Sequence, residues 1–341
     1  MTEKIFENNL INSLVRNFTR SPNQLNKTLE SDVEIINIED KIIIAATTDS
    51  IVEEIESGLY KDPYLIGWMI VNVNFSDLAA AGANQLGILI SEIIPSSIKN
   101  EYLQEMQNGI NDACKKLNSF VLGGDTNLGE KLILTGTALG YFENNNYLTR
   151  KGCLPNQILY STNKLGRGNA FAITQLLSNK EKIKYLPIAR LKESKIIKKY
   201  ASASMDTSDG VISTLDQLMR INNCGFELNE DWESSIDDES KTISGKYKIP
   251  LWLLFAGQHG EFELLFTIDG DKEKQFLSEA ELINWQPIKL GKVIPDKTIK
   301  ISLYGKLQSI NSAEIRNLSF NLNEGVHSYL NSLLEIDNGL R

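Results

Sequence analysis

The first half of the chain alternates between short β-branched runs and longer segments with helical spacing. Residues 41–48 (KIIIAATT) predict a buried strand that ends just before Asp49. Between Tyr64 and Ala83 apolar residues recur at helical spacing, and small residues near the end of this segment predict close packing. Further elements are expected as a helix at 99–117 and strands at 119–122 and 132–141.

The pattern begins again after Arg150, which predicts a boundary there. A strand at 157–161 leads through a glycine-containing turn to a helix at 169–177. Later elements are expected as a turn at 206–210, a helix ending near 221 and a strand at 263–268. The acidic segment 231–244 is predicted to be a surface insertion. The expected fold is two α+β halves, one domain at 1–150 and one at 151–341.

Composition narrows the class of partner. The formal charge of -9 and the pI near 5 disfavour nucleic acid and anionic membranes, so a small-molecule substrate is expected. The three cysteines have no paired spacing typical of a zinc site or a disulfide framework. No signal peptide and no apolar run of about 20 residues is recognised. We therefore expect a cytoplasmic protein.

Aspartates beside Gly, Ser or Thr carry most of the chemical signal. These aspartates are Asp32, Asp49, Asp77, Asp125, Asp206 and Asp209. Several carboxylates in one cleft would suit Mg²⁺, which takes oxygen ligands. Glycines such as Gly123, Gly124 and Gly210 would let backbone N–H groups approach a phosphate. Each motif alone has a simpler explanation, since aspartate is common in turns and at helix N-termini.

Taken in order, the motifs resemble those of the thiamine-monophosphate kinase family. The motifs are TTDSIVEE (47–54), NFSDLAAAGA (74–83), LGGDT (122–126), LTRKGC (148–153), MDTSDGV (205–211) and EFELLFT (261–267). The resemblance implies the two-domain aminoimidazole ribonucleotide synthetase-like fold, of mixed α+β and α/β type. It implies a homodimer formed through the sheet of the N-terminal domain, a C-terminal α/β domain that completes the cleft, and transfer of a phosphoryl group from ATP to thiamine monophosphate.

The resemblance also assigns roles to individual residues. The implied magnesium ligands are Asp32, Thr48, Asp49, Asp77, Asp125, Asp206 and Asp209. The implied nucleotide contacts are Gly124, Asp125, Arg150 and Ser208. Asp49, Asp125 and Asp209 are expected to be the catalytic residues. These roles agree with the chemistry, because phosphoryl transfer depends on positioning and on neutralising phosphate charge.

Departures from the family pattern gather on the acceptor side. The family's GDD motif is replaced by residues 30–32 (ESD), and Glu56 stands where a histidine is usual. Gly260, followed by Glu261, replaces a substrate-contacting glutamate, and Val326 replaces an aromatic residue. These substrate-side residues lead to the hypothesis that the acceptor has changed, because an acid at Glu56 would repel an acceptor phosphate.

Two alternatives stay open at this stage. The same ATP site could activate a carbonyl or amide oxygen for C–N bond formation, as in the synthetase branch of the superfamily. The chain could also be a non-catalytic nucleotide-binding protein that lost activity with its GDD motif. The acceptor is accordingly expected to carry either a phosphate or a carbonyl group.

Overall fold

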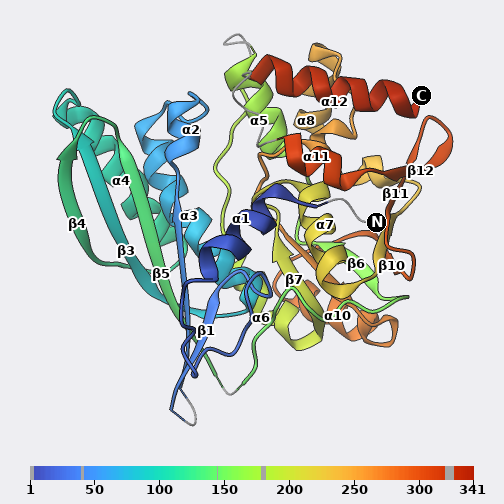
Figure 1. The fold of residues 1–341 in the computed structure, drawn as a ribbon, viewed down its shortest axis with the longest axis horizontal. Helices are drawn as coiled ribbons and strands as arrows, with labels where there is room; N and C mark the ends of the chain where they lie inside the picture. The colour runs from blue at the N-terminus through green and yellow to red at the C-terminus, as the bar shows by residue number, and fades with distance from the viewer. Residues whose placement is uncertain (1–3, 40–41, 144, 178–181, 319–325) are drawn as a thin grey trace.

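A computed structural model describes residues 4–39, 42–143, 145–177, 182–318 and 326–341. It contains two mixed sheets with helices packed against them (Figure 1). The first sheet has the strand order β1-β2-β5-β3-β4, and the second has the order β12-β11-β8-β10-β6-β9-β7. Two mixed sheets with helices agree with the expected α+β halves. The division at residue 150 stays a prediction, although the strands of the two sheets fall on either side of it.

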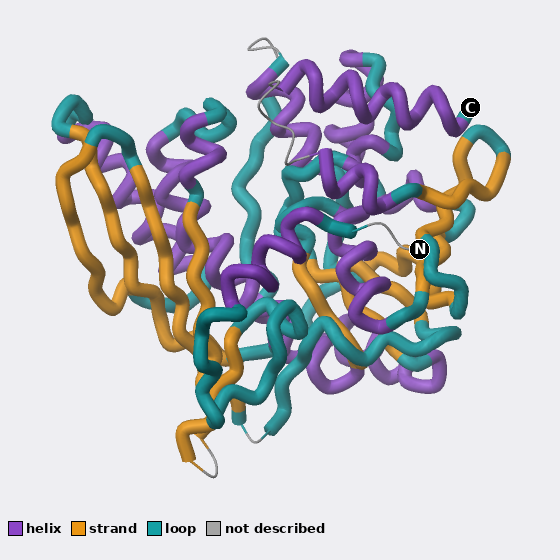
Figure 2. Tube along the Cα trace, in the orientation of Figure 1, coloured by secondary structure: helices purple, strands orange, loops and turns teal. Residues whose placement is uncertain are grey.

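The first sheet is mostly antiparallel, and only β3 and β4 run parallel. Its strands are β1 (Glu34–Glu39), β2 (Ile42–Ser50), β3 (Asn84–Pro95), β4 (Val121–Gly129) and β5 (Ile133–Phe142). The helices of this half are α2 (Val52–Glu56), α3 (Pro63–Ala81) and α4 (Asn100–Lys116). Figure 2 shows these helices on one side of the sheet only, so the other side, called here the open face, is uncovered.

Helix α3 is the central element between the two halves. Asp62 caps its N-terminus by accepting the Tyr64 N–H at 3.0 Å, and Gly82 ends it at φ 75°. The helix packs against β2 and β5 on one side and against α6 and β7 on the other. Contact on several sides explains why its residues from Leu65 to Ala81 are nearly all buried. The helix predicted between Tyr64 and Ala83 is confirmed.

The second sheet is covered by more helices, and only β8 and β11 run parallel. Its strands are β6 (Ile158–Ser161), β7 (Ala201–Asp206), β8 (Gly225–Leu228), β9 (Leu264–Ile268), β10 (Ile288–Ile294), β11 (Ile299–Leu303) and β12 (Lys306–Ile310). The helices are α5 (Arg167–Leu176), α6 (Leu191–Tyr200), α7 (Val211–Asn222), α8 (Asp238–Tyr247), α9 (Leu253–Ala256), α10 (Glu273–Leu282), α11 (Ser312–Leu318) and α12 (Val326–Leu340). Helix α1 (Phe6–Val15) lies in front of the junction between the halves (Figure 1).

Two sequence predictions about local structure are wrong. The GGD motif was expected to follow a short strand, but β4 runs through Gly124 and Asp125 to Gly129. The segment 231–244 was expected to be a surface insertion. It instead forms a 3₁₀ turn and most of α8, and Trp232 and Ile236 are only 3% and 0% exposed. These two apolar side chains anchor an otherwise polar segment in the core.

The structure bears on the expectations about membrane spans and cysteines. In the part of the chain that the structure describes, no helix combines the length and apolar character needed to cross a membrane. Cys114, Cys153 and Cys224 are all buried free thiols.

Candidate active site

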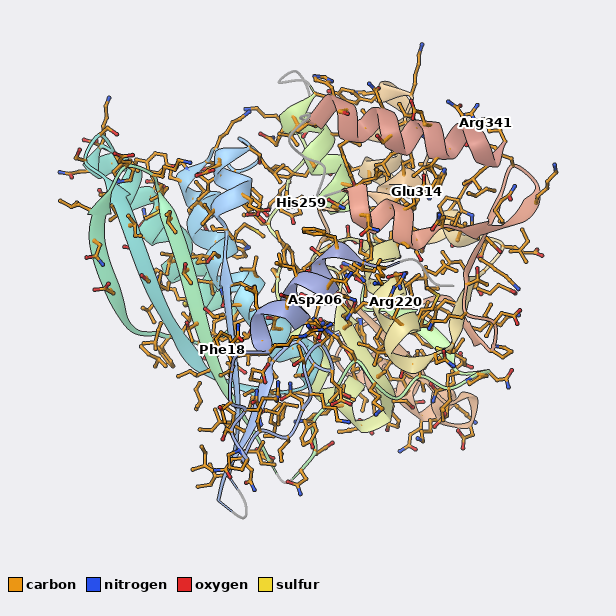
Figure 3. The ribbon with its side chains drawn as sticks, viewed as in Figure 1. Phe18, Asp206, Arg220, His259, Glu314 and Arg341 are labelled. Carbon is orange, nitrogen blue, oxygen red and sulfur yellow. The ribbon has the colours of Figure 1, made fainter. Side chains whose placement is uncertain are left out.

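Three aspartates from distant parts of the sequence meet between the two sheets. Asp32 precedes β1, Asp77 lies within α3, and Asp206 ends β7. One carboxylate oxygen from each residue lies within 4.8 Å of the other two. Figure 3 places Asp206 near the middle of the molecule, between the first sheet and the second. The fold thus brings together three of the predicted metal ligands, called here the carboxylate cluster.

Hydrogen bonds orient the Asp206 and Asp32 carboxylates of this cluster. Ser76 Oγ donates to Asp206 Oδ2 at 2.6 Å, and Ser208 Oγ donates to Asp206 Oδ1 at 3.2 Å. Arg150 Nη2 donates to Asp32 Oδ1 at 3.0 Å. The Nε of Arg150 is buried and has no hydrogen-bond partner among the described residues. Buried donors are rarely left unpaired, so this N–H fits an anionic ligand beside the cluster.

Burial and mutual repulsion raise the pKa values of these acids. The pKa of Asp77 lies well above its usual value because the side chain is desolvated and faces Asp49, Asp206 and Asp32. Thr47 Oγ1 donates to Asp77 Oδ2 at 2.5 Å and opposes this shift. Burial, and then the charge of Asp32, raises the pKa of Asp206 to about 7. A set of oxygen ligands with excess negative charge fits Mg²⁺, which would relieve the repulsion.

Two further predicted ligands border the cluster. The Asp49 N–H donates to Asn74 Oδ1 at 3.0 Å, which fixes the end of β2 against α3. Burial is the main cause that raises the pKa of Asp49, and the charge of Asp32 adds to it. Asp209 lies in the turn between β7 and α7. Its side chain keeps access to solvent, but its recessed position, with the charge of Glu7 nearby, raises its pKa to about 6.

Known proteins with similar sequences identify the family. Residues 30–142 match the family model for AIR synthase related protein, N-terminal domain. The chain is 30% identical to the thiamine-monophosphate kinase of Methanocaldococcus jannaschii over an alignment of 291 positions that covers 79% of this chain and 88% of the relative. The chain belongs to the thiamine-monophosphate kinase family. A second family member, from Buchnera aphidicola subsp. Schizaphis graminum, is 29% identical over an alignment of 311 positions. That alignment covers 88% of this chain and 90% of the relative.

Solved structures show the same two-domain fold. The structure of AaThiL complexed with AMPPCP and TMP matches with a TM-score of 0.73 at 22% identity, over 91% of this chain and 99% of the other. The E. coli hydrogenase maturation protein HypE matches with a TM-score of 0.68 at 16% identity, over 89% and 97%. Because the fold also occurs outside the thiamine-monophosphate kinase family, the fold alone does not identify the acceptor.

Two of the predicted nucleotide contacts, Gly124 and Asp125, lie away from the cluster within one chain. Across the first sheet, Asp49 pairs with Gly136, Gly136 with Ile90, and Ile90 with Gly124. Three strand spacings put Gly124 about 14 Å from Asp49. Asp125, the next residue, is exposed on β4. Gly124 and Asp125 therefore do not join the carboxylate cluster of their own chain.

Two predicted acceptor-side residues have local roles. Glu56 ends α2 and forms an ion pair with Lys131 at 2.7 Å, close to the turn between β4 and β5. Gly260 is packed against the turn after β7, where an added Cβ would lie 1.4 Å from the carbonyl oxygen of Thr207. Its N–H donates to the carbonyl of Ser208 at 2.9 Å. Gly260 is thus a packing position that admits no side chain.

The other two acceptor-side residues border α5. Glu261 accepts hydrogen bonds from the N–H groups of Gly166 at 2.9 Å and Gly168 at 3.1 Å, so it holds the start of α5. Burial raises the pKa of Glu261 to about 8, against these two hydrogen bonds. Val326 begins α12 and, with Tyr329, lines a small apolar cavity of about 80 Å³ between α5 and α12. Among the four predicted acceptor-side residues, Val326 borders this cavity.

Sequence reasoning missed two hydroxyl donors. Thr47, and not Thr48, donates to the cluster, because successive strand residues face opposite sides of a sheet. Thr48 Oγ1 instead donates to the carbonyl of Gly136 at 2.8 Å. Ser76 was also missed, although it directly precedes Asp77. The sequence did carry a signal for Thr47. Side chains alternate between the two faces of a strand, so Thr47, two residues before Asp49, lies on the same face as Asp49.

An aromatic group between the halves was missed as well. Tyr60 follows α2, whereas Phe171, Tyr185 and His259 come from the second half. The Phe171 and Tyr185 rings stack with centroids 4.5 Å apart, and Tyr60 Oη lies 3.4 Å from His259 Nε2. Because these residues are far apart in sequence, no local pattern indicated that they meet. The group joins the first half to the loop that precedes Gly260.

Proposed function

We propose that the chain transfers the γ-phosphoryl group of ATP to thiamine monophosphate, the acceptor in the name of its family. The observation that carries this proposal is the carboxylate cluster of Asp32, Asp77 and Asp206 beside the Nε of Arg150, which has no partner among the residues the structure describes. Converging oxygen ligands with one oriented cationic donor form the arrangement that phosphoryl transfer requires. Family membership supports the identity of both substrates.

The proposed roles divide between the two halves. Residues 1–150 supply Asp32, Asp49 and Asp77, and residues 151–341 supply Asp206 and Asp209. These carboxylates would hold Mg²⁺ against the phosphates of ATP. Bound Mg²⁺ would neutralise charge on the β- and γ-phosphates during transfer. The chain's own hydroxyl donors keep the carboxylates oriented, and the Arg150 guanidinium offers its Nε–H, which has no partner among the described residues, to a phosphate oxygen.

The acceptor side is compatible with an anionic acceptor. Glu56 was expected to repel an acceptor phosphate, but its charge is neutralised by Lys131 at 2.7 Å. The acceptor phosphate is already ionised at neutral pH, so it needs no residue to remove a proton before attack. Thiamine monophosphate is therefore the first acceptor to test. Changed acceptor specificity, if present, would have to arise from residues such as Val326 and not from the charge of Glu56.

We further propose that two chains pair through the open face of the first sheet. All nine residues of β4 are exposed, and Leu89 and Tyr141 are exposed on neighbouring strands. An uncovered apolar sheet face of this kind favours a protein partner. Asp125 lies on the same sheet, about 14 Å from the cleft of its own chain. In the proposed dimer, Asp125 would act in the active site of the partner subunit.

Mixing two inactive variants tests both parts of the proposal. Asp49→Asn and Asp125→Asn are each expected to abolish formation of thiamine diphosphate from ATP and thiamine monophosphate. Subunit exchange in an equal mixture produces half heterodimers, each with one site that carries both substitutions and one intact site. The mixture is therefore expected to regain about a quarter of wild-type activity.

The result separates the alternatives. If Asp125 acts within its own chain, both sites of every heterodimer carry one substitution, and the mixture stays inactive. If the wild-type protein forms no thiamine diphosphate, the proposed acceptor is wrong. Release of inorganic phosphate with a new C–N bond would identify the synthetase reaction instead.

A further inference from the structure

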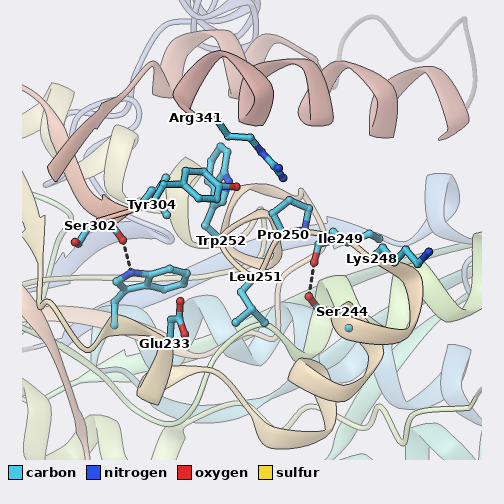
Figure 4. A pocket seen from close by; sticks show the side chains of 13 residues that line it. Glu233, Ser244, Lys248, Ile249, Pro250, Leu251, Trp252, Ser302, Tyr304 and Arg341 are labelled. Carbon is cyan, nitrogen blue, oxygen red and sulfur yellow. Dashed lines mark hydrogen bonds between the residues drawn. The ribbon is translucent and has the colours of Figure 1, made fainter. Parts of the chain in front are cut away.

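A second cavity lies in the C-terminal half, on residues with no role in the proposed reaction. Its volume is about 340 Å³, within the range of small-ligand sites. Figure 4 shows its walls, which come from the 3₁₀ turn at Trp232, the segment between α8 and α9, the turn between β11 and β12, and the end of α12. The ligand of this cavity would not touch the carboxylate cluster.

A buried carboxylate holds the aromatic wall of this cavity in place. Asp337, which is 1% exposed, accepts hydrogen bonds from Trp252 Nε1 at 2.7 Å and from the Tyr304 hydroxyl. Arg341 Nε also donates to Asp337 at 3.0 Å, and its guanidinium lies 5.1 Å from the centre of the Tyr304 ring. One carboxylate thus fixes an indole, a phenol and a guanidinium against one another, so the wall is rigid before any ligand arrives.

The backbone supports this wall at an energetic cost. Tyr304 and Gly305 form the two-residue turn between β11 and β12, with φ values of 53° and 76°. Both positions of such a turn need positive φ, and Asn-Gly is the favoured pair. Tyrosine at the first position is therefore unfavourable for the turn itself. Its ring and hydroxyl, which asparagine could not supply, give a reason for its presence.

Charged side chains occupy opposite ends of the cavity. Lys248 and Glu233 lie at opposite ends, and Arg341 lies between them, over the aromatic wall (Figure 4). Lys248 and Glu233 form no hydrogen bond or ion pair through their side chains with any residue the structure describes. Asp337 lies beneath the surface, where its charge is satisfied by its three donors. The open surface therefore has a cationic end, an aromatic wall and an acidic end.

We propose that this cavity binds an amino-bearing heteroaromatic ring that carries a phosphate, the chemistry of a nucleoside monophosphate. The ring lies against Tyr304, and the phosphate is bound by Lys248 and Arg341. The ring's amino group donates to Glu233. The volume suits one ring, a sugar-sized linker and one phosphate. This inference does not depend on the proposed kinase reaction.

Calorimetry with adenosine monophosphate tests the proposal. The protein is first saturated with Mg²⁺ and a non-hydrolysable ATP analogue, so that the cleft is filled, and adenosine monophosphate is then titrated. We expect one saturable site per chain. Adenosine and ribose 5-phosphate, which lack the phosphate and the ring respectively, are each expected to bind at least tenfold more weakly. Equal binding of either fragment would overturn the proposed ligand chemistry.

Three variants assign the binding to this cavity. Arg341→Gln is expected to weaken binding at least tenfold. Tyr304→Asn is expected to weaken it at least fivefold while leaving the thermal midpoint unchanged or higher, because Asn-Gly suits the turn. Lys306→Gln, which removes an exposed charge from the adjacent strand, serves as the control and should leave affinity unchanged. Unchanged affinity in both Arg341→Gln and Tyr304→Asn, or no saturable binding by wild type, would overturn the proposal.

Discussion

The two sides of the first sheet place similar aspartates in opposite environments. On the cleft side, Asp77 sits within α3 among other acids, and its pKa is raised well above its usual value by burial and their charge. On the open face, Asp125 lies on an exposed strand and accepts a hydrogen bond from Asn127 Nδ2 at 2.6 Å. The cleft side carries an unfavourable charge arrangement that a cation would relieve. The open face has no such repulsion between charges. Its exposed side chains instead favour contact with a second protein surface.

Substitution of the two aspartates should separate these environments most strongly. Asp77→Asn is expected to lower kinase activity about 1,000-fold, roughly 4 kcal/mol in transition-state stabilisation. It should also raise the thermal midpoint of the metal-free protein, because a desolvated acid among like charges is removed. Asp125→Asn should abolish activity as well, but leave the metal-free midpoint unchanged. Kinetics and thermal unfolding with and without Mg²⁺ measure both effects.

The stability readout decides this comparison. Equal midpoints for wild type and Asp77→Asn in metal-free buffer would mean that the cluster stores no repulsion. An activity loss below tenfold for Asp77→Asn would exclude it as an essential ligand.

Two glycines differ in the space around them: Gly260 is tightly packed beside the cleft, whereas Gly245 has open space beside it. Gly260→Ala is expected to destabilise the protein by about 3 kcal/mol, because its Cβ would lie 1.4 Å from the Thr207 carbonyl. Gly245→Ala, in α8 with nothing within 4 Å of its Cβ, should stabilise by about 0.5–1 kcal/mol. Urea unfolding of both variants provides the measurement. A neutral Gly260→Ala would show that the turn holding Asp206 shifts easily.

Much of this contrast could be predicted from sequence, and the limits are physical. Local periodicity located α3 and the strand ending near Asp49, because each pattern reflects contacts within one element. The same local reasoning placed Asp125 in a turn, because Gly-Gly-Asp is also typical of turns. The structure instead has these residues within β4, an exposed edge strand that tolerates them. The contact of Tyr60 with His259 depends on docking of the two halves, which no local pattern encodes.

The partly buried His259 gives the cleft side a pH dependence. Burial lowers the pKa of His259 to about 3, whereas an unfolded histidine titrates near 6.5. Between these values the unfolded state binds an extra proton, so stability falls as pH decreases below about 6.5. We expect a loss of about 1–2 kcal/mol between pH 7 and pH 5, since part of the side chain still meets solvent.

Comparison of the two histidines isolates this effect. His259→Gln should flatten the stability profile between pH 7 and pH 5, whereas His327→Gln, at an exposed position of α12, should keep the wild-type slope. Urea unfolding at both pH values measures the difference. The same slope in wild type and His259→Gln would assign the pH dependence to other groups.

The smallest expected effect concerns Glu56, at the outer end of α2. Its carboxylate is held by Lys131 at 2.7 Å, and both side chains are well exposed, at 43% and 66%. Glu56→Gln should therefore change the KM for thiamine monophosphate less than twofold. Lys131→Ala frees the carboxylate, so any rise in KM in this variant should disappear in the double variant. A tenfold lower KM for Glu56→Gln would instead show that Glu56 faces the acceptor phosphate, and it would restore acceptor-side repulsion as the cause of a changed specificity.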